Sequence, residues 1–208
     1  MNESDSISYF FDSLRPCIES QRLARFVDLH PGERMLDVGC GTGYIALFLG
    51  WRFPHCLELT GIDIQSSLIE RACQNRDRFL TLASNPIPPI HFYQSDLNRA
   101  VPKEKIFDVI VSNPPFFDPR SSRLSPTLSK RIARQENTLS LQSLFAFASR
   151  HLALRGRFYL VVPSNRIDEI QSHLVDHQMD PLQIETDLAI RKRTGGVHFI
   201  CASKREPS

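Results

Sequence analysis

The stretch Met35-Leu36-Asp37-Val38-Gly39-Cys40-Gly41-Thr42-Gly43-Tyr44 decides the fold of this chain. Its apolar start predicts a short buried strand, and its three alternating glycines predict a tight turn that opens into a helix over residues 44–51. Glycines in such a turn let the backbone pass close to a ligand, because side chains there would occupy the ligand's space. The stretch therefore predicts a nucleoside-binding α/β domain.

Strands and helices alternate along the rest of the chain. Strands are predicted over residues 57–64, 90–94, 107–112 and 157–162, with helical periodicity between them. Two further strands, over 182–190 and 197–202, flank a turn with two glycines, which favours a hairpin and an antiparallel last strand. The pattern predicts an α/β, Rossmann-like, doubly wound fold: a mostly parallel seven-stranded sheet with an antiparallel last strand and helices on both faces.

We expect a single domain over residues 31–208, because no linker or composition break divides the chain. Residues 1–30 are a separate helical lead-in, whose aromatic residues Tyr9, Phe10 and Phe11 either close over the cofactor as a lid or form a hydrophobic staple or core contact. Local signals also predict three helix boundaries. These are a capping box at Ser67 and Glu70, a left-handed helix end at Gly156, and a helix closed by Asp180-Pro181.

The composition is that of an ordinary globular protein, with 41% hydrophobic and 23% charged residues and a net charge of +2, too small to identify a partner. The five cysteines form no C-x-x-C pair and the seven histidines have no zinc-ligand spacing, which predicts free thiols in a reducing compartment and no metal site. The polar start and the lack of a long apolar run predict a cytoplasmic protein without a membrane segment. We expect a monomer or a weak dimer.

The spacing of the glycines narrows the choice of ligand. In the common dinucleotide fingerprint the third glycine falls three residues after the second, whereas Gly43 follows Gly41 by two. The shorter spacing favours a nucleoside without a pyrophosphate. The carboxylate of Asp37 would repel phosphates, yet it suits a ligand that carries an ammonium and a sulfonium group. S-adenosyl-L-methionine, with S-adenosyl-L-homocysteine as its product, is such a ligand, and a nicotinamide cofactor is a remote alternative.

Acidic residues follow the ends of the predicted parallel strands, where open α/β sheets bind ligands. Asp63 is placed to accept hydrogen bonds from ribose hydroxyls, and Asp96 to accept one from an adenine amino group, with Leu97 near the ring. Each aspartate alone could equally be a helix cap or a loop residue. Together they predict a cofactor site made of Asp37, Gly39, Cys40, Gly41, Gly43, Asp63, Ile64, Asp96, Leu97 and Asn113.

The strand predicted over 107–112 ends at a second motif, Asn113-Pro114-Pro115-Phe116. The Asn113 side-chain oxygen and the Pro114 carbonyl would accept hydrogen bonds from a planar amine and expose its lone pair for methylation. The prolines would keep the turn rigid, and Phe116 offers a face for a stacked base. An ordinary turn is the alternative for these residues taken alone. After an apolar strand and downstream of a cofactor motif, they predict four catalytic residues: Asn113, Pro114, Pro115 and Phe116.

Two basic stretches flank the predicted catalytic turn. One follows it in sequence, and the other lies in the predicted hairpin, which should reach the same edge of the sheet. Basic side chains there suit phosphate groups and predict RNA as the substrate, with tRNA preferred. Solvated surface charge is the alternative. The predicted substrate-binding residues are Arg120, Arg123, Arg131, Arg134, Arg191, Lys192 and Arg193.

The two motifs resemble those of the class I S-adenosylmethionine-dependent methyltransferases of the small domain type, whose Asn-Pro-Pro-aromatic motif marks methylation of an amino group in adenine, guanine or glutamine. The sequence is most similar to the bacterial tRNA1(Val) (adenine(37)-N6)-methyltransferases. The resemblance implies an enzyme that methylates adenine N6 in tRNA. Before Pro31 the chain departs from that family, which carries a glycine-bearing segment here. The stretches that carry the resemblance are 112–117, 119–120, 133–134, 139–141 and 156–163.

Other substrates remain open on the residues alone. The same turn would serve a glutamine amide in a protein release factor or guanine N2 in ribosomal RNA, since each presents a planar nitrogen. The lack of a sizeable accessory domain weakens the glutamine alternative, and the basic flanks favour nucleic acid. A non-catalytic RNA-binding scaffold with the same fold is the alternative from another class, and the presence of both Asp37 and Asn113 argues against it.

Overall fold

One seven-stranded sheet organises the protein, seen in a computed structural model that describes residues 3–97, 105–114, 140–190 and 195–206. The strand order is β3-β2-β1-β4-β5-β7-β6. Strands β1 to β5 pair in parallel, and β7 pairs antiparallel with both β5 and β6, which confirms the predicted fold class. The strands are β1 (Arg34–Val38), β2 (Glu58–Asp63), β3 (Ile90–Gln94), β4 (Phe107–Ser112), β5 (Leu152–Pro163), β6 (Met179–Asp187) and β7 (Val197–Lys204).

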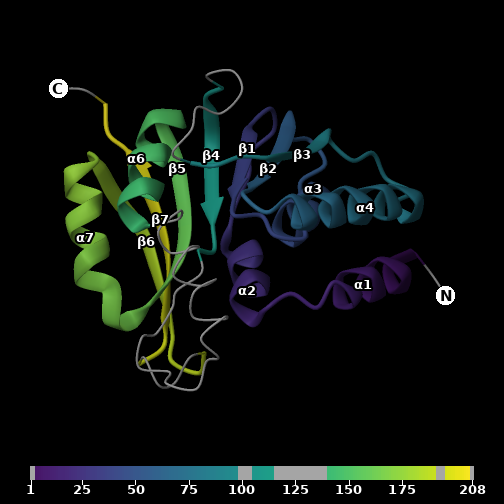
Figure 1. Cartoon of the computed structure of the whole chain (residues 1–208), viewed down its shortest axis with the longest axis horizontal. Helices are drawn as coiled ribbons and strands as arrows, with labels where there is room; N and C mark the ends of the chain where they lie inside the picture. Colours follow the sequence, from purple (N-terminus) through teal and green to yellow (C-terminus); the bar gives the residue numbers. More distant parts are fainter. Residues whose placement is uncertain (1–2, 98–104, 115–139, 191–194, 207–208) are drawn as a thin grey trace.

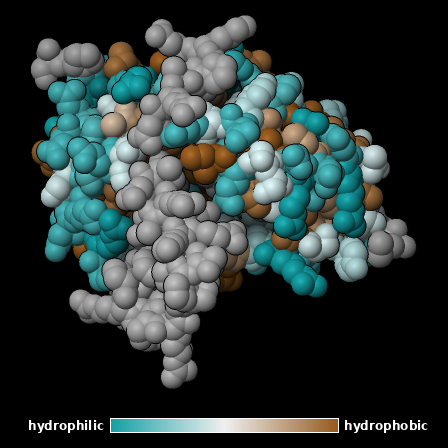
Figure 2. Space-filling view, viewed as in Figure 1, coloured by the Kyte–Doolittle hydropathy of each residue, from teal (hydrophilic) through white to brown (hydrophobic). Residues whose placement is uncertain are grey.

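Helices cover both faces of this sheet (Figure 1). Alternate residues of β1 point to opposite faces, so Met35 joins the core under α1 to α4 while Leu36 joins the core under α6 and α7. The outer surfaces of α4 and α7 are largely hydrophilic in Figure 2, as expected of helices that bury one face. The helices are α1 (Glu3–Ser13), α2 (Ile18–Phe26), α3 (Tyr44–Arg52), α4 (Ser66–Leu82), α6 (Leu141–His151), α7 (Ile167–Asp176) and the short 3₁₀ helix η1 (Ser164–Arg166).

Two of the aromatic residues of α1 are core residues. Phe10 is fully buried and stacks on Phe79 of α4, and Phe11 packs edge-on against Tyr44 of α3. Tyr9 is 65% exposed. Phe10 and Phe11 are therefore core residues, whereas Tyr9 is not. Across the described ranges, no helix is both long and apolar enough to cross a membrane.

The predicted left-handed helix end at Gly156 is wrong. Helix α6 passes directly into β5 at Leu152, and the left-handed residue is Arg155, with a φ of 59°. Gly156 is needed for a different reason, because a Cβ there would lie 2.8 Å from the carbonyl oxygen of Ala153. The pairing of β4 with β5 shifts register at this point, so the glycine serves a strand irregularity, which its position in the sequence does not reveal.

Two other predicted helix boundaries are also wrong. Helix α4 begins at Ser66 after Gln65, and no side chain caps it, so Ser67 and Glu70 form no capping box. Helix α7 ends at Asp176, and Pro181 lies inside β6 instead of closing the helix. A proline is tolerated there because β6 is an edge strand and its register shifts beside Pro181.

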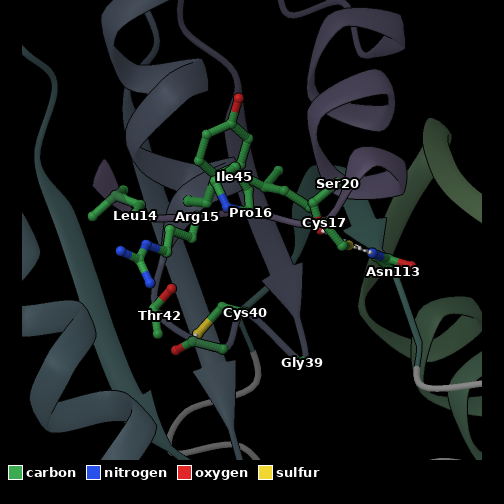
Figure 3. Close-up of a pocket in the computed structure, with 12 residues that line it drawn as sticks. Leu14, Arg15, Pro16, Cys17, Ser20, Gly39, Cys40, Thr42, Ile45 and Asn113 are labelled. Carbon is green, nitrogen blue, oxygen red and sulfur yellow. Dashed lines mark hydrogen bonds between the residues drawn. The ribbon is translucent and has the colours of Figure 1, made fainter. Parts of the chain in front are cut away.

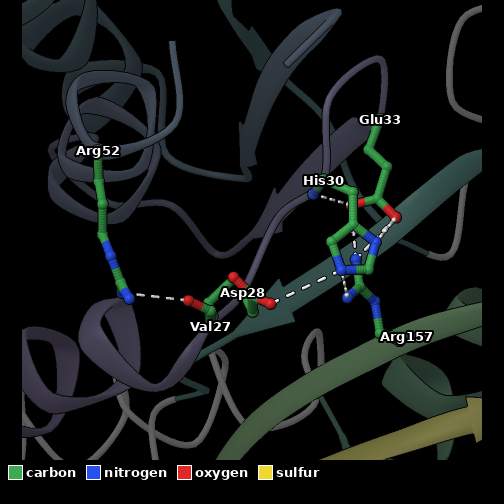
Figure 4. Close-up of polar contacts among 6 residues, drawn as sticks. All are labelled: Val27, Asp28, His30, Glu33, Arg52 and Arg157. Atoms are coloured by element: carbon green, nitrogen blue, oxygen red, sulfur yellow. Dashed lines mark hydrogen bonds and ion pairs between the residues drawn. The ribbon is translucent and has the colours of Figure 1, made fainter. Parts of the chain in front are cut away.

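Charged side chains connect the segment before β1 to strand β5 (Figure 4). They lie at the edge of the sheet opposite the carboxyl ends of the parallel strands. Arg157 of β5 donates hydrogen bonds to both carboxylate oxygens of Glu33, and the two side chains are only 14% and 19% exposed. His30 lies 3.3 Å from the same guanidinium. Arg52 donates to the carbonyl oxygens of Arg25 and Val27 at 2.8 and 3.2 Å, which satisfies the end of α2.

Replacing Glu33 by alanine is expected to lower the free energy of unfolding by about 1–3 kcal/mol, because it leaves the guanidinium of Arg157 largely buried without its carboxylate. Urea denaturation would measure the change. The control is Glu206→Ala, which removes an exposed ion pair with Arg155 and should change the free energy by less than about 0.5 kcal/mol. Equal effects of the two substitutions would show that the largely buried Glu33–Arg157 ion pair stabilises the fold no more than an exposed one.

Candidate functional site

The carboxyl ends of β1, β2, β3 and β4 meet at one edge of the sheet, because these four strands run parallel and lie side by side. The chain order reverses between β1 and β4, which makes their junction the topological switch point where open α/β sheets bind ligands. Ser112 at the end of β4 donates a hydrogen bond of 2.8 Å to the carbonyl oxygen of Val38 and holds the two strand ends together.

The glycine turn after β1 is held by its neighbours through the backbone. The carbonyl oxygen of Ile62 accepts hydrogen bonds from the N–H groups of Gly39 and Cys40 at 2.8 and 3.0 Å. Asp63 accepts one from the N–H of Gly41 at 3.0 Å and another from the N–H of Gln65 at 2.9 Å. The turn is therefore rigid before any ligand arrives, and Asp63 has a structural task besides its predicted one.

The ring of Phe92 requires glycine at two positions. A Cβ on Gly43 would lie 2.6 Å from the ring, and a Cβ on Gly61 in β2 would lie 2.5 Å from it. Gly43 also has a φ of 86°, in the left-handed region that glycine favours. The absence of two side chains thus lets Phe92 pack directly beneath the turn.

The substitution Gly61→Ala is expected to destabilise the protein by about 1–3 kcal/mol, because the added methyl group overlaps the Phe92 ring and touches the Cβ of Cys40. Thermal unfolding would measure the loss. Adding Phe92→Leu, which removes ring atoms at the overlap, should recover part of it. No recovery in the double variant would show that strain elsewhere causes the effect.

Asp37 is a buried carboxyl group directly before the turn. It is 1% exposed, and within the described residues neither of its oxygens has a hydrogen-bond partner. Burial is the main cause that raises its pKa, from 3.8 to about 8; the nearby charge of Asp63 adds to the rise, and the backbone at Ala46 opposes it. The same burial, with the charge of Asp37, raises the pKa of the Cys40 thiol. A buried carboxyl left without a partner indicates a place for a ligand's donor or cation.

A pocket of about 210 Å³ opens at the switch point (Figure 3). The glycine turn and the start of α3 form one wall, Asn113 contributes at the end of β4, and the segment between α1 and α2 forms the opposite wall. The lining residues are Leu14, Arg15, Pro16, Cys17, Ser20, Gly39, Cys40, Gly41, Thr42, Tyr44, Ile45 and Asn113.

The Asn113 side chain reaches the N-terminal wall of this pocket. Its amide nitrogen donates to the Ser20 hydroxyl at 2.8 Å and lies 3.3 Å from the Cys17 sulfur. Figure 3 shows the nitrogen directed toward Cys17 and Ser20 and the oxygen directed away from them. In this view the Asn113 oxygen points away from the other labelled lining residues, so only the nitrogen is bonded to the N-terminal wall.

The structure brings part of the predicted site together. Gly39, Cys40, Gly41 and Asn113 line the pocket. Asp63 holds the turn by a hydrogen bond, Gly43 is its last residue, and Asp37 is buried directly before it. Ile64, Asp96, Leu97 and Pro114 follow neighbouring strands at the same edge without lining the pocket. Pro115, Phe116, Arg120, Arg123, Arg131, Arg134, Arg191, Lys192 and Arg193 lie outside the described residues.

The N-terminal wall is what sequence reasoning missed. Leu14, Arg15, Pro16, Cys17 and Ser20 are far in sequence from both motifs, and no pattern in the segment marks it as part of a site. Residues 1–30 carried two general signals, the possible lid and the departure from the family resemblance, and neither pointed to these five residues. In the described part of the chain, no group of His, Cys, Asp and Glu side chains is arranged to hold a metal ion.

The sheet order, the glycine turn at the switch point and the antiparallel last strand define the class I methyltransferase fold. Solved structures share it. One is the N-methyltransferase NodS from Bradyrhizobium japonicum in complex with S-adenosyl-L-homocysteine, 16% identical with a TM-score of 0.61 over 94% of this chain and 88% of that one. Another is a ribosomal protein L11 methylase from Lactobacillus delbrueckii subsp. bulgaricus, 16% identical with a TM-score of 0.62 over 90% and 77%.

This chain belongs to the methyltransferase small domain family, whose family model matches residues 17–179. It is similar to the tRNA1(Val) (adenine(37)-N6)-methyltransferase of Porphyromonas gingivalis, with 35% identity over 71% of this chain and 56% of that protein. The same enzyme of Parabacteroides distasonis is 35% identical over 72% of this chain and 60% of its own length. The chain thus spans less than two thirds of the length of these curated relatives.

Proposed function

We propose that this protein is an S-adenosylmethionine-dependent N-methyltransferase that acts on an exocyclic amine, with adenine N6 in tRNA as the target. The observation that carries the proposal is the juxtaposition of two groups at the switch point. Asp37, a buried carboxyl without a hydrogen-bond partner among the described residues, lies directly before the glycine turn, and the amide Asn113 lines the pocket just after β4. The first suits a cationic nucleoside, and the second suits a planar amine.

The residues present fit S-adenosylmethionine. The carboxyl of Asp37, which has no hydrogen-bond partner among the described residues, can compensate an ammonium group. The turn leaves open space at Gly41, where a Cβ would meet nothing within 4 Å. Asp63, at the end of β2, and Asp96 are the proposed acceptors for ribose and adenine. When bound, the cofactor supplies a methyl group on a positively charged sulfur.

The chain's own contribution to the reaction is positioning. The Asn113 oxygen and the Pro114 carbonyl accept hydrogen bonds from the target amine and hold its lone pair toward the methyl group. The amine proton leaves to solvent after transfer, because a methylated aromatic ammonium is acidic and needs no strong base. Consistent with this, the only strongly shifted carboxyl among the described residues is Asp37, on the cofactor side of the pocket.

The curated relatives' names support tRNA as the substrate and adenine as the base. We place the protein in the cytoplasm with this partner, as a monomer or a weak dimer. Strand β6 runs parallel to β4, since both strands between them in the sheet, β5 and β7, pair as described above. Strand β6 therefore ends, at Asp187, at the edge where the pocket opens, which supports a phosphate-binding role for the basic residues that follow it in sequence.

Replacing Arg191, Lys192 and Arg193 together by alanine is expected to weaken tRNA binding by about tenfold or more at low salt, because up to three phosphates are no longer neutralised and their counterions are no longer released. The slope of log K against log salt should fall by about one for each phosphate that the variant no longer binds. Filter binding over a salt series would measure both quantities. Unchanged affinity and slope would remove the hairpin from the RNA-binding surface.

Incubation with labelled S-adenosylmethionine and total tRNA, followed by mass spectrometry of the nucleosides, tests the proposed function. The expected product is N6-methyladenosine. Parallel incubations with ribosomal RNA and with a release factor test guanine N2 and glutamine N5 as targets. Cofactor binding without transfer to any of these substrates would contradict the proposal and favour an RNA-binding scaffold.

A further inference from the structure

Arg15 lies in the N-terminal wall of the pocket at an unusual backbone position. It follows helix α1, its N–H donates to the carbonyl oxygen of Asp12 at 3.1 Å, and its φ of 49° lies in the left-handed region. A left-handed helix end is normally a glycine, and an arginine there costs about 1 kcal/mol. The side chain that occupies this position lines the pocket opposite the glycine turn.

The guanidinium of Arg15 has no counter-ion in the part of the chain that the structure describes. Figure 3 shows it directed toward the side of the pocket where Thr42 lies. Asp63, an acidic side chain that contacts the turn, is already held by the N–H groups of Gly41 and Gln65. Arg15 is exposed, so its guanidinium is free to form a charge-assisted hydrogen bond with an anionic group on a ligand in the pocket.

The two walls of the pocket therefore carry groups of opposite charge. A cation stands on the outer wall at Arg15, and a carboxyl is buried behind the inner wall at Asp37. An α-amino acid end carries one carboxylate and one ammonium, which is the complement of this arrangement. Resting on the proposed function above, we propose that Arg15 binds the α-carboxylate of the methionine part of S-adenosylmethionine.

The test compares two ligands that differ only in the part Arg15 would contact. S-adenosylhomocysteine carries the amino acid end, and 5′-methylthioadenosine lacks it. Isothermal titration calorimetry of the full chain with each ligand should show that Arg15→Ala lowers the affinity for S-adenosylhomocysteine by about tenfold or more. The affinity for 5′-methylthioadenosine should not change. Arg15→Lys, which keeps the charge but loses the fork of donors, should fall between wild type and Arg15→Ala. The control is Arg150→Ala on the exposed side of α6, with both affinities unchanged.

Each other outcome contradicts the proposal. An equal loss for both ligands would show that Arg15 supports the fold or the nucleoside, and no loss for either would show a solvated side chain. A loss of tRNA affinity alone, measured in the same variants, would assign Arg15 to a phosphate of the RNA. If the wild-type protein binds neither ligand, the proposed function itself fails, whereas wild-type binding that Arg15→Ala leaves intact overturns only the role of Arg15.

Discussion

Replacing Asn113 by alanine is expected to lower turnover by about a hundredfold to a thousandfold while the affinity for S-adenosylhomocysteine stays nearly unchanged. The substitution removes the acceptor that orients the target amine, whereas the cofactor is held mainly by the turn after β1. Single-turnover methylation of tRNA and isothermal titration with S-adenosylhomocysteine would measure the two quantities. A loss confined to cofactor binding would show that Asn113 is wrongly assigned.

The structure adds a control for this experiment. The Asn113 amide also donates to Ser20, so its removal loosens the N-terminal wall as well as the catalytic turn. Ser20→Ala deletes the same hydrogen bond but keeps the Asn113 oxygen, and each variant should lose about 1 kcal/mol of stability. If the oxygen is the catalytic group, Ser20→Ala retains far more activity than Asn113→Ala. Equal losses would mean that the tie to α2, and not the acceptor, is what matters.

The substitution Asp37→Asn is expected to weaken cofactor binding about tenfold to a hundredfold, because it removes the charge that compensates the ammonium group. The affinity of the wild type should rise as pH rises from 5.5 to 7.5. The carboxyl pKa of about 8 in the folded protein means that binding an ammonium must displace a proton, and the cost falls by up to about tenfold per pH unit. Isothermal titration in buffers of different ionisation enthalpy would count the proton released.

The stability of the unliganded protein should fall as pH rises, whereas the cofactor affinity should rise. Because the folded-state pKa of Asp37 is raised above the unfolded value of 3.8, the folded protein holds a proton that the unfolded chain gives up. Its contribution is complete below about pH 4 and is lost as pH rises to about 8. The unfolding temperature of the unliganded wild type should therefore fall over this window relative to Asp37→Asn. Parallel curves for the two proteins would contradict a buried, titrating Asp37, whose electrostatic neighbours are Asp63 and Cys40.

The fold was predictable because its signals are local. Apolar runs at 35–38 and 107–112 mark buried strands, and Gly39-Cys40-Gly41-Thr42-Gly43 marks a turn whose backbone only glycine adopts easily. The helix boundaries failed where a tertiary contact overrode a local signal. At Gly156 the crowding comes from Leu152 and Ala153 at a register shift, and at Pro181 the edge of the sheet tolerates what an inner strand would not.

The sequence by itself determined the chemistry available at one edge of the sheet, because the carboxyl ends of parallel strands must meet there whatever else the chain does. Asp37, Asp63 and Asn113 could be assigned to a single site on that ground. Only the tertiary structure decided that Arg15, Cys17 and Ser20 complete the pocket and hold the Asn113 amide. Their position depends on how α1 packs against α3 and α4 through buried aromatic rings, a long-range contact that no local pattern encodes.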